Sequence, residues 1–216
     1  MSFQTVRPSW QKRLYVTCGI VALHIACYYS VNLINSWRLP SDFIDFYTTL
    51  DRWIPYLDWT WALYYLGDIY ITLWAAFIFW QMPKAKFYRA LYAYMGMVIL
   101  GAAIQVMIPG KAPWPTTLTG AQRWMHDLIS MRPYACLPSM HVALTVFPAC
   151  LTLSVLNSRV FKALSTILAL LIIISTLTLK EHFLIDAVAG ILLGLAAYAY
   201  WRRGKVPRFA TPRARD

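Results

Sequence analysis

Six long apolar runs, separated by short polar links, divide this chain. They cover residues 14–33, 59–80, 87–108, 139–156, 160–179 and 182–201. A helix needs about 20 predominantly apolar residues to cross the hydrocarbon core of a bilayer, and every run has about that length. The pattern therefore predicts an all-α integral membrane protein. We expect a six-transmembrane-helix bundle that forms a single membrane domain over residues 1–216, with a basic tail at residues 202–216.

The links on one side of this bundle are long enough to hold further structure. After the first run, Pro40-Ser41-Asp42 is typical of a helix start. Aromatic and aliphatic residues follow at helical spacing from Phe43 to Leu57, which predicts an amphipathic helix on the outer leaflet. A second short amphipathic helix is predicted over residues 121–130. Short interfacial helices are thus expected to cover the outer face.

The composition excludes an ordinary soluble domain and makes nucleic-acid binding a poor explanation of the charge. Charged residues make up 13% of the chain, against about 25% in a soluble domain. The net charge is +11, but the basic residues alternate with the apolar runs instead of lining one soluble face. No groove-reading motif accompanies them. We therefore expect membrane lipids, and not nucleic acid, as the partners of this charge.

The distribution of basic residues also predicts an orientation. Of the 20 lysines and arginines, 14 lie on the side of the two termini and six on the other side. By the positive-inside rule, both termini of this multi-pass protein are cytoplasmic. The links that hold His141 and His182 then face outward, toward a periplasm or a lumen.

Two histidines and one aspartate are the strongest candidates for chemistry. If residues 139–156 and 160–179 both cross the membrane, the chain leaves one face at His141 and returns to it at His182. Asp186 follows His182 by four residues, so on a helix the two share a face. A neutral imidazole can attack phosphorus while a carboxylate fixes its tautomer. We expect His182 to attack, Asp186 to orient it and His141 to protonate the leaving oxygen.

Other groups near these histidines suit a phosphate. Ser139 offers a hydroxyl, and Lys111 and Lys180 offer positive charge on the same face. Both histidine motifs begin predicted helices, whose free N–H groups and positive dipole ends favour an anion. The position at a membrane surface implies a substrate with a lipid tail and a phosphate head.

Two ionisable residues lie inside predicted spans, away from this cluster. His24 is in the first span and Asp68 in the second. A carboxylate in a span is costly and is a functional hypothesis by default. Because Asp68 lies several turns below the histidines in this layout, we favour a structural role, in which it is protonated or paired with His24.

The histidine motifs resemble those of a known family. Pro138-Ser139-Met140-His141 is similar to the Pro-Ser-x-His motif of the phosphatidic acid phosphatase type 2 superfamily, and His182-x-x-x-Asp186 resembles its final motif. Lys111-Ala112-Pro113-Trp114 is similar to a loop of the inositol phosphorylceramide synthase-like branch. The resemblance implies a six-helix core, no cofactor, and a phosphohistidine mechanism with His182 as nucleophile. Its implied phosphate contacts are Ser139, Lys111, Lys180 and Trp114.

Two positions depart from the pattern of many superfamily phosphatases. Met125 stands where a lysine precedes Arg132-Pro133, and Thr176 stands where an arginine precedes the nucleophile. The resemblance therefore leaves two reactions open. The partner of the lipid phosphate or diphosphate is either water or an alcohol acceptor.

Two other classes of function remain open from the residues alone. His141, His182 and Asp186 could be the ligands of a metal-dependent hydrolase, since two histidines and a carboxylate are a known donor set. The six spans could also form a non-enzymatic carrier. A carrier would more often place polar groups along a path through several spans, whereas most ionisable residues here gather toward one end.

Overall fold

The computed structural model describes residues 9–113, 123 and 134–203. Long helices make up most of this part of the chain, and its only β-type contact is an isolated bridge between Ile44 and Gly110. Five long helices are α1 (Trp10–Ser36), α4 (Lys84–Met107), α6 (Met140–Val155), α7 (Arg159–Thr178) and α8 (Leu184–Arg203). The second span is made of three consecutive pieces: α2 (Trp61–Ile69), the π-helical η4 (Tyr70–Trp74) and α3 (Ala75–Trp80).

The expected membrane-spanning helices are confirmed. Within the described residues, five helical stretches are long and apolar enough to cross a membrane, and α6 is a shorter apolar helix. Their outward faces are apolar as well: the side chains of Ile167 on α7 and Leu192 on α8 are 56% and 62% exposed. Exposed apolar faces of this extent are unusual in soluble monomers. The chain is therefore an all-α, multi-pass membrane protein.

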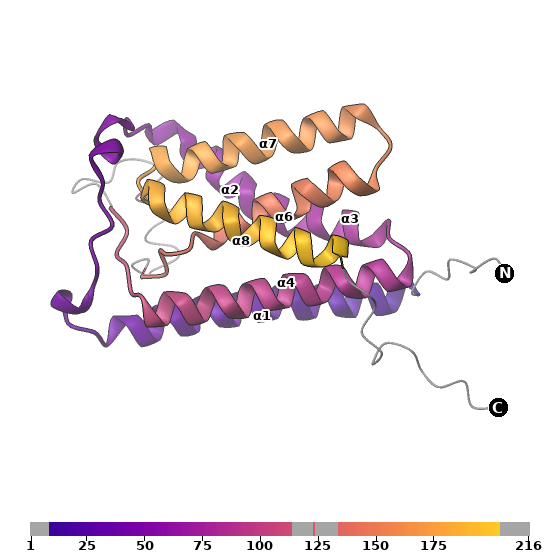
Figure 1. Cartoon of the computed structure of the whole chain (residues 1–216), viewed down its shortest axis with the longest axis horizontal. Coiled ribbons are helices and arrows are strands. Elements are labelled where there is room, and N and C mark those ends of the chain that lie inside the picture. Colours follow the sequence, from indigo (N-terminus) through magenta and orange to yellow (C-terminus); the bar gives the residue numbers. More distant parts are fainter. Residues whose placement is uncertain (1–8, 114–122, 124–133, 204–216) are drawn as a thin grey trace.

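Helix α6 occupies the centre of the bundle and packs against α7 and α8, while α1 pairs with α4 and α2 with α7 (Figure 1). Its closest neighbour is α8, where Gly190 and Gly194 face the carbonyl oxygens of Ser139 and Ala143. A Cβ atom at either glycine would overlap these carbonyls. Small residues spaced by four thus let the two helix backbones approach closely, which places α8 beside the first turn of α6.

The prediction of an amphipathic helix after Pro40 is wrong. Three 3₁₀ turns stand there instead: η1 (Pro40–Asp42), η2 (Thr49–Trp53) and η3 (Asp58–Thr60). The chain between these turns does not form one helix because its backbone groups bond to distant segments. Ile44 N–H donates to the Pro109 carbonyl, and Leu57 N–H donates to the Thr178 carbonyl. We call residues 43–57 the outer strap. The other predicted interfacial helix, at residues 121–130, lies outside the described residues except for Arg123.

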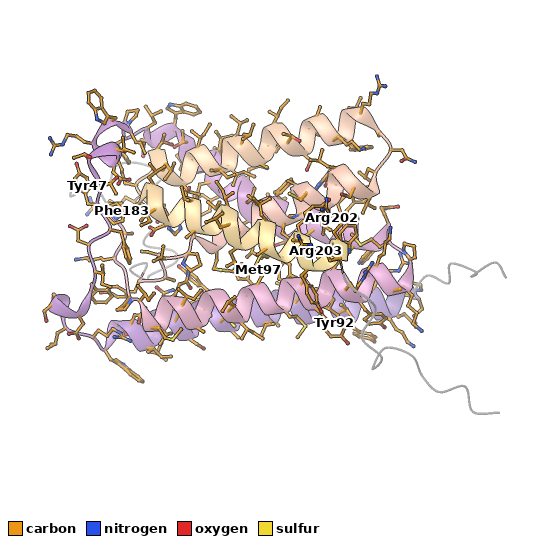
Figure 2. The ribbon with its side chains drawn as sticks, viewed as in Figure 1. Tyr47, Tyr92, Met97, Phe183, Arg202 and Arg203 are labelled. Carbon is orange, nitrogen blue, oxygen red and sulfur yellow. The ribbon has the colours of Figure 1, made fainter. Side chains whose placement is uncertain are left out.

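The strap crosses one end of the bundle, from the α1 and α4 side to the α7 side (Figure 1). Tyr47 of the strap contacts Phe183 edge to face at that end, and Arg202 and Arg203 lie at the opposite end (Figure 2). Helix α1 begins and α8 ends at this second, basic end (Figure 1). The segment that carries His182 is thus covered by the strap.

Candidate active site

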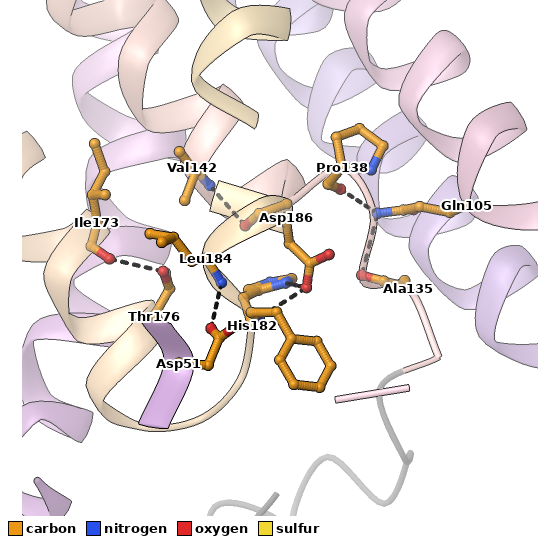
Figure 3. A network of polar contacts seen from close by, with 12 residues as sticks. Asp51, Gln105, Ala135, Pro138, Val142, Ile173, Thr176, His182, Leu184 and Asp186 are labelled. Carbon is orange, nitrogen blue, oxygen red and sulfur yellow. Dashed lines mark hydrogen bonds and ion pairs between the residues drawn. The ribbon is translucent and has the colours of Figure 1, made fainter. Parts of the chain in front are cut away.

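His182 and Asp186 form a buried pair at the start of α8. The Nδ1 atom of His182 lies 3.5 Å from Oδ2 of Asp186, and the side chains are 8% and 0% exposed (Figure 3). The same Asp186 oxygen accepts a hydrogen bond from the Phe183 N–H at 2.9 Å. A carboxylate at Nδ1 leaves the other ring nitrogen, Nε2, as the atom available for attack.

The outer strap holds the beginning of α8 in place. Asp51 accepts a hydrogen bond from the Leu184 N–H at 2.8 Å on one carboxylate oxygen (Figure 3) and bonds from Thr48 on the other. Burial by itself would raise the pKa of Asp51, but these hydrogen bonds and the charge of Lys180 hold it below the ordinary aspartate value. A carboxylate at a helix N-terminus is also favoured by the helix dipole. Asp51 therefore fixes the helix that carries Asp186.

The first turn of α6 is tied to the same helix. Ser139 caps α6, its hydroxyl accepting from the Val142 N–H, and its own N–H donates to the backbone carbonyl of Asp186 at 3.0 Å. The side-chain amide of Gln105 on α4 donates to the carbonyls of Ala135 and Pro138 (Figure 3). These bonds satisfy buried backbone groups and set the position from which His141 projects.

His141 is seated against the second span. Its ring stacks on Tyr64, with centroids 4.3 Å apart and planes at 16°. Gly67 leaves the space that the ring fills, because an added Cβ would overlap Nε2 of His141. On the remaining side, Nδ1 of His141 lies 3.8 Å from Oδ1 of Asp68. Three residues of one α2 face thus enclose this imidazole.

One cavity of about 400 Å³ connects these parts. His141 and His182 both line it, so the two predicted catalytic histidines share one space. Residues of α1, α2, η4, α4 and the first turn of α6 line the rest. Two of them on α1, Ile25 and Tyr29, are 50% and 44% exposed, so the cavity reaches the surface of the bundle at α1.

A comparison with protein families now adds to this geometry. The family model described as the PAP2 superfamily matches residues 41–200. The chain belongs to the PAP2 superfamily. This membership supports a phosphatase or phosphotransferase type of activity in general. No curated protein and no solved structure matches the chain. The matched region includes the strap and all three residues of the candidate site, whereas α1 lies before it.

The residues predicted to bind phosphate in this PAP2 protein differ in their exposure and in the hydrogen bonds that they already make. The Lys180 ammonium donates to the backbone carbonyls of Asp51 and Ile54, at 3.1 and 2.6 Å. Lys111 is exposed beyond the end of α4, and Trp114 lies outside the described residues. Ser139 is fully buried and serves as a helix cap.

The helix N–H groups that were predicted to bind an anion already bind carboxylates of the protein. At the start of α8, the N–H groups of Phe183 and Leu184 donate to the carboxylates of Asp186 and Asp51. The two carboxylates therefore occupy donors that a phosphate would need. In this PAP2 chain, the N-terminus of α8 therefore binds the side chains of Asp186 and Asp51.

The arrangement gives little support to the metal-site alternative. Across the described residues, no three His, Cys, Asp or Glu side chains are grouped as ligands of one ion. His182 faces Asp186, whereas His141 faces Asp68 on another helix. The two histidines each have their own carboxylate.

Sequence reasoning missed two of the residues at this site. Asp51 was placed on a surface helix, and Asp68 was interpreted as structural and well below the histidines. The available signal for Asp68 was its charge inside a span. For Asp51, a buried aspartate that caps a helix 133 residues later, nothing in the local sequence pointed to the contact.

Proposed function

We propose that this protein cleaves or transfers the phosphoryl group of a lipid phosphate or diphosphate ester through a phosphohistidine intermediate. The observation that carries the proposal is the buried pair of His182 and Asp186, which opens into the same cavity as His141. A nucleophile with an orienting carboxylate, and a second imidazole within one space, are the parts that such a reaction requires.

In the first step, Nε2 of neutral His182 attacks phosphorus. An N–P bond forms as the P–O bond to the leaving group breaks. Asp186, 3.5 Å from Nδ1, stabilises the positive charge that develops on the ring. Protonated His141 gives its proton to the leaving oxygen. A lipid phosphate thus releases the lipid alcohol, and a lipid diphosphate releases the lipid monophosphate.

In the second step, an acceptor hydroxyl attacks the phosphohistidine. His141, now neutral, takes the proton of that hydroxyl, the N–P bond breaks, and both histidines return to their starting states. With water as acceptor the enzyme is a phosphatase, and with an alcohol it is a transferase. The motif Lys111-Ala112-Pro113-Trp114 favours the inositol phosphorylceramide synthase-like branch, in which transfer is the expected outcome.

The substrate's phosphate needs positive charge and hydrogen-bond donors. Lys111 and Trp114, on the loop that follows α4, are our first choice, because Lys111 is exposed and free to approach an anion. Contacts from Lys180 or Ser139 would require these residues to exchange their present hydrogen bonds. We place this site on the outer face of the membrane, with both termini in the cytoplasm, from the positive-inside rule.

The first experiment uses the purified protein with lipid phosphates and diphosphates, with a chelator present, and with or without alcohol acceptors. We expect wild-type protein to release phosphate or to form a new phospholipid. His182→Ala should lose about 1,000-fold or more in rate, because the nucleophile itself is removed. Acid-labile, base-stable phosphate on wild-type protein, absent from His182→Ala, would identify the phosphohistidine.

Two outcomes would contradict the proposal. Equal activity of His182→Ala and wild type would exclude His182 as nucleophile. Loss of wild-type activity on adding chelator would instead favour a metal-dependent hydrolase. Product identity separates the two remaining cases: free phosphate without acceptor marks a phosphatase, and a new phospholipid formed only with acceptor marks a transferase.

A further inference from the structure

Asp68 is a carboxylate inside a membrane-spanning helix, beside a residue of the candidate site. It stands on α2 directly before the π-helical turn η4. Ionisable side chains in spans are costly and are retained chiefly where they serve a function, and π-helical turns are frequent at functional sites. Both features point to this part of α2.

The face of α2 that carries Asp68 is shaped around one imidazole. Tyr64, Gly67 and Asp68 have the spacing i, i+3 and i+4, which places them on one side of a helix. Tyr64 supplies a flat surface at 4.3 Å, Gly67 supplies room, and Asp68 supplies a carboxylate 3.8 Å from Nδ1 of His141. A purely structural carboxylate would not need the other two.

The two histidines of the site therefore have the same kind of partner, an aspartate at Nδ1. Nδ1 of His182 faces Asp186 at 3.5 Å, and Nδ1 of His141 faces Asp68 at 3.8 Å. In both cases a carboxylate at Nδ1 orients the ring and stabilises the imidazolium form. This leaves Nε2 of His182 available, whereas Nε2 of His141 is buried beside Gly67. A histidine that must donate a proton to a leaving group needs that charged form.

The surroundings of the two carboxylates differ. Asp186 is fully buried, whereas Asp68 is 56% exposed and lines the cavity. The ionisable groups that line this cavity with Asp68 and His141 are His24, Cys27, Tyr28, Tyr29, Tyr64, Tyr65 and His182. Among the described residues that line it there is no lysine or arginine.

We propose that Asp68 is the positioning residue of the general acid: it holds His141 through Nδ1 and stabilises its imidazolium form for proton donation to the leaving oxygen. This inference rests on the proposed function and extends it by a residue of the second span. Asp68 does not touch the phosphorus and acts only through His141.

A change of leaving group tests the proposal. Two substrates share one hydrocarbon chain: a phosphate ester of an alkyl alcohol, which leaves only when protonated, and an ester of an alkyl-substituted nitrophenol, which leaves as an anion. We expect Asp68→Asn to lower kcat/KM for the alkyl ester by about 100-fold and for the aryl ester by less than about 3-fold. His141→Ala should show the same selectivity, and His182→Ala should lose both substrates.

Matched variants separate positioning from structure. Asp68→Glu keeps the carboxylate and should restore part of the alkyl-ester rate. Asp45→Asn makes the same chemical change at an exposed position of the strap, where the carboxylate accepts a hydrogen bond from the Tyr47 N–H, and should behave as wild type. Equal losses of Asp68→Asn on both esters, or wild-type rates on both, would overturn the proposal.

A second measurement does not depend on activity. The chain has four histidines, so nitrogen spectra of isotope-labelled histidine can resolve His141 with the help of a His141→Gln sample. We expect Asp68→Asn to move the Nδ1 signal of His141 and to leave that of His182 in place. An unmoved His141 signal would overturn the positioning role even if the proposed reaction is wrong.

Discussion

At the scale of single residues, the candidate site is where buried polar atoms remain unpaired. Among the described side chains, the buried nitrogen and oxygen atoms without a hydrogen-bond partner are Arg89 Nε, His141 Nε2, His182 Nδ1 and Asp186 Oδ1. Buried polar groups in proteins are nearly always satisfied. Three of these four atoms belong to the three residues of the candidate site. The protein therefore holds its reactive groups in place mainly through neighbouring backbone and helix contacts.

A substitution at Gly67 tests whether the packing of His141 against α2 matters for activity. Gly67→Ala introduces a methyl group that overlaps the imidazole, so His141 must move. Overpacking of this kind costs about 1–3 kcal/mol, and we expect both a lower unfolding temperature and at least about 10-fold lower activity, as positioning errors near 1 Å cause.

Gly96→Ala is the matched control for this change. Gly96 lies on α4, also inside a helix, and an added Cβ meets no atom within 4 Å. Removing a helical glycine should there leave stability unchanged or raise it by about 0.5–1 kcal/mol. If Gly67→Ala and Gly96→Ala behave alike in activity, the seat on α2 is not needed to hold His141.

At the scale of elements, the outer strap is a structural part of the site. Lys180, in the link between α7 and α8, adopts a positive φ of 61° and its ammonium bonds two strap carbonyls. The strap returns the contact through Asp51, which bonds the first N–H of α8. Strap and link are thus joined by two reciprocal contacts on either side of His182.

Removal of the Asp51 carboxylate tests this coupling. Asp51→Ala leaves the Leu184 N–H without its partner, and the loss of hydrogen bonds to a buried charged group should cost about 2 kcal/mol. We expect a lower unfolding temperature in detergent and a reduced kcat, since Asp186 lies in the first turn of the same helix. Asp42→Ala, which removes an exposed carboxylate that bonds Leu39 in η1, should change neither.

The pH dependence of stability gives a second check on Asp51. Its pKa is lowered in the folded protein, so its contribution to stability is complete above the ordinary aspartate value of about 4. The contribution is lost as pH falls through the lowered folded value. Wild type should therefore lose more stability than Asp51→Asn on acidification from about pH 5. Parallel curves for the two proteins would argue against a charged Asp51 contact.

At the scale of the whole molecule, the two ends of the bundle carry different chemistry. Tyr47 of the strap and Phe183, the neighbour of His182, lie at one end, and Arg202 and Arg203 lie at the other (Figure 2). Lys111 follows Gly110, which pairs with Ile44 of the strap. Such asymmetry of basic residues orients membrane proteins during insertion. The end with the histidines should therefore face away from the cytoplasm.

Labelling of single cysteines tests this orientation. The four described cysteines are free thiols and would first be replaced. In that background, Lys111→Cys should react with an impermeant maleimide in intact cells, and Arg203→Cys should react only after permeabilisation. Both should react in detergent, which confirms that each thiol is accessible. The reverse pattern in intact cells would place the site in the cytoplasm.

Much of the fold and part of the site could be predicted from local patterns. A run of 20 apolar residues has few alternatives in a membrane, because its backbone groups must bond within the helix. The nearness of His182 and Asp186 was predicted from a spacing of four on one helix face. The pair is present, but α8 begins only at Leu184, so His182 lies just before the helix. These predictions needed no knowledge of distant contacts.

The predictions that failed depended on contacts between distant segments. The aromatic spacing after Pro40 is compatible with a helix, but bonds to Pro109 and Thr178 keep the strap from forming one helix. Asp68 was expected to lie several turns below the histidines. Helix α6 has only 16 residues, and His141 meets α2 about one to two turns after Trp61, at Tyr64, Gly67 and Asp68.

The sequence by itself determined which segments form apolar helices, five of them long enough to cross a membrane within the described residues, and it pointed to the three residues of the candidate site. Hydrophobic length and helical spacing are local properties, and the bilayer enforces them one helix at a time. Only the tertiary structure decided that Asp51 caps α8, that Lys180 holds the strap and that Asp68 faces His141. Those contacts depend on the relative depth and rotation of packed helices, which no local pattern encodes.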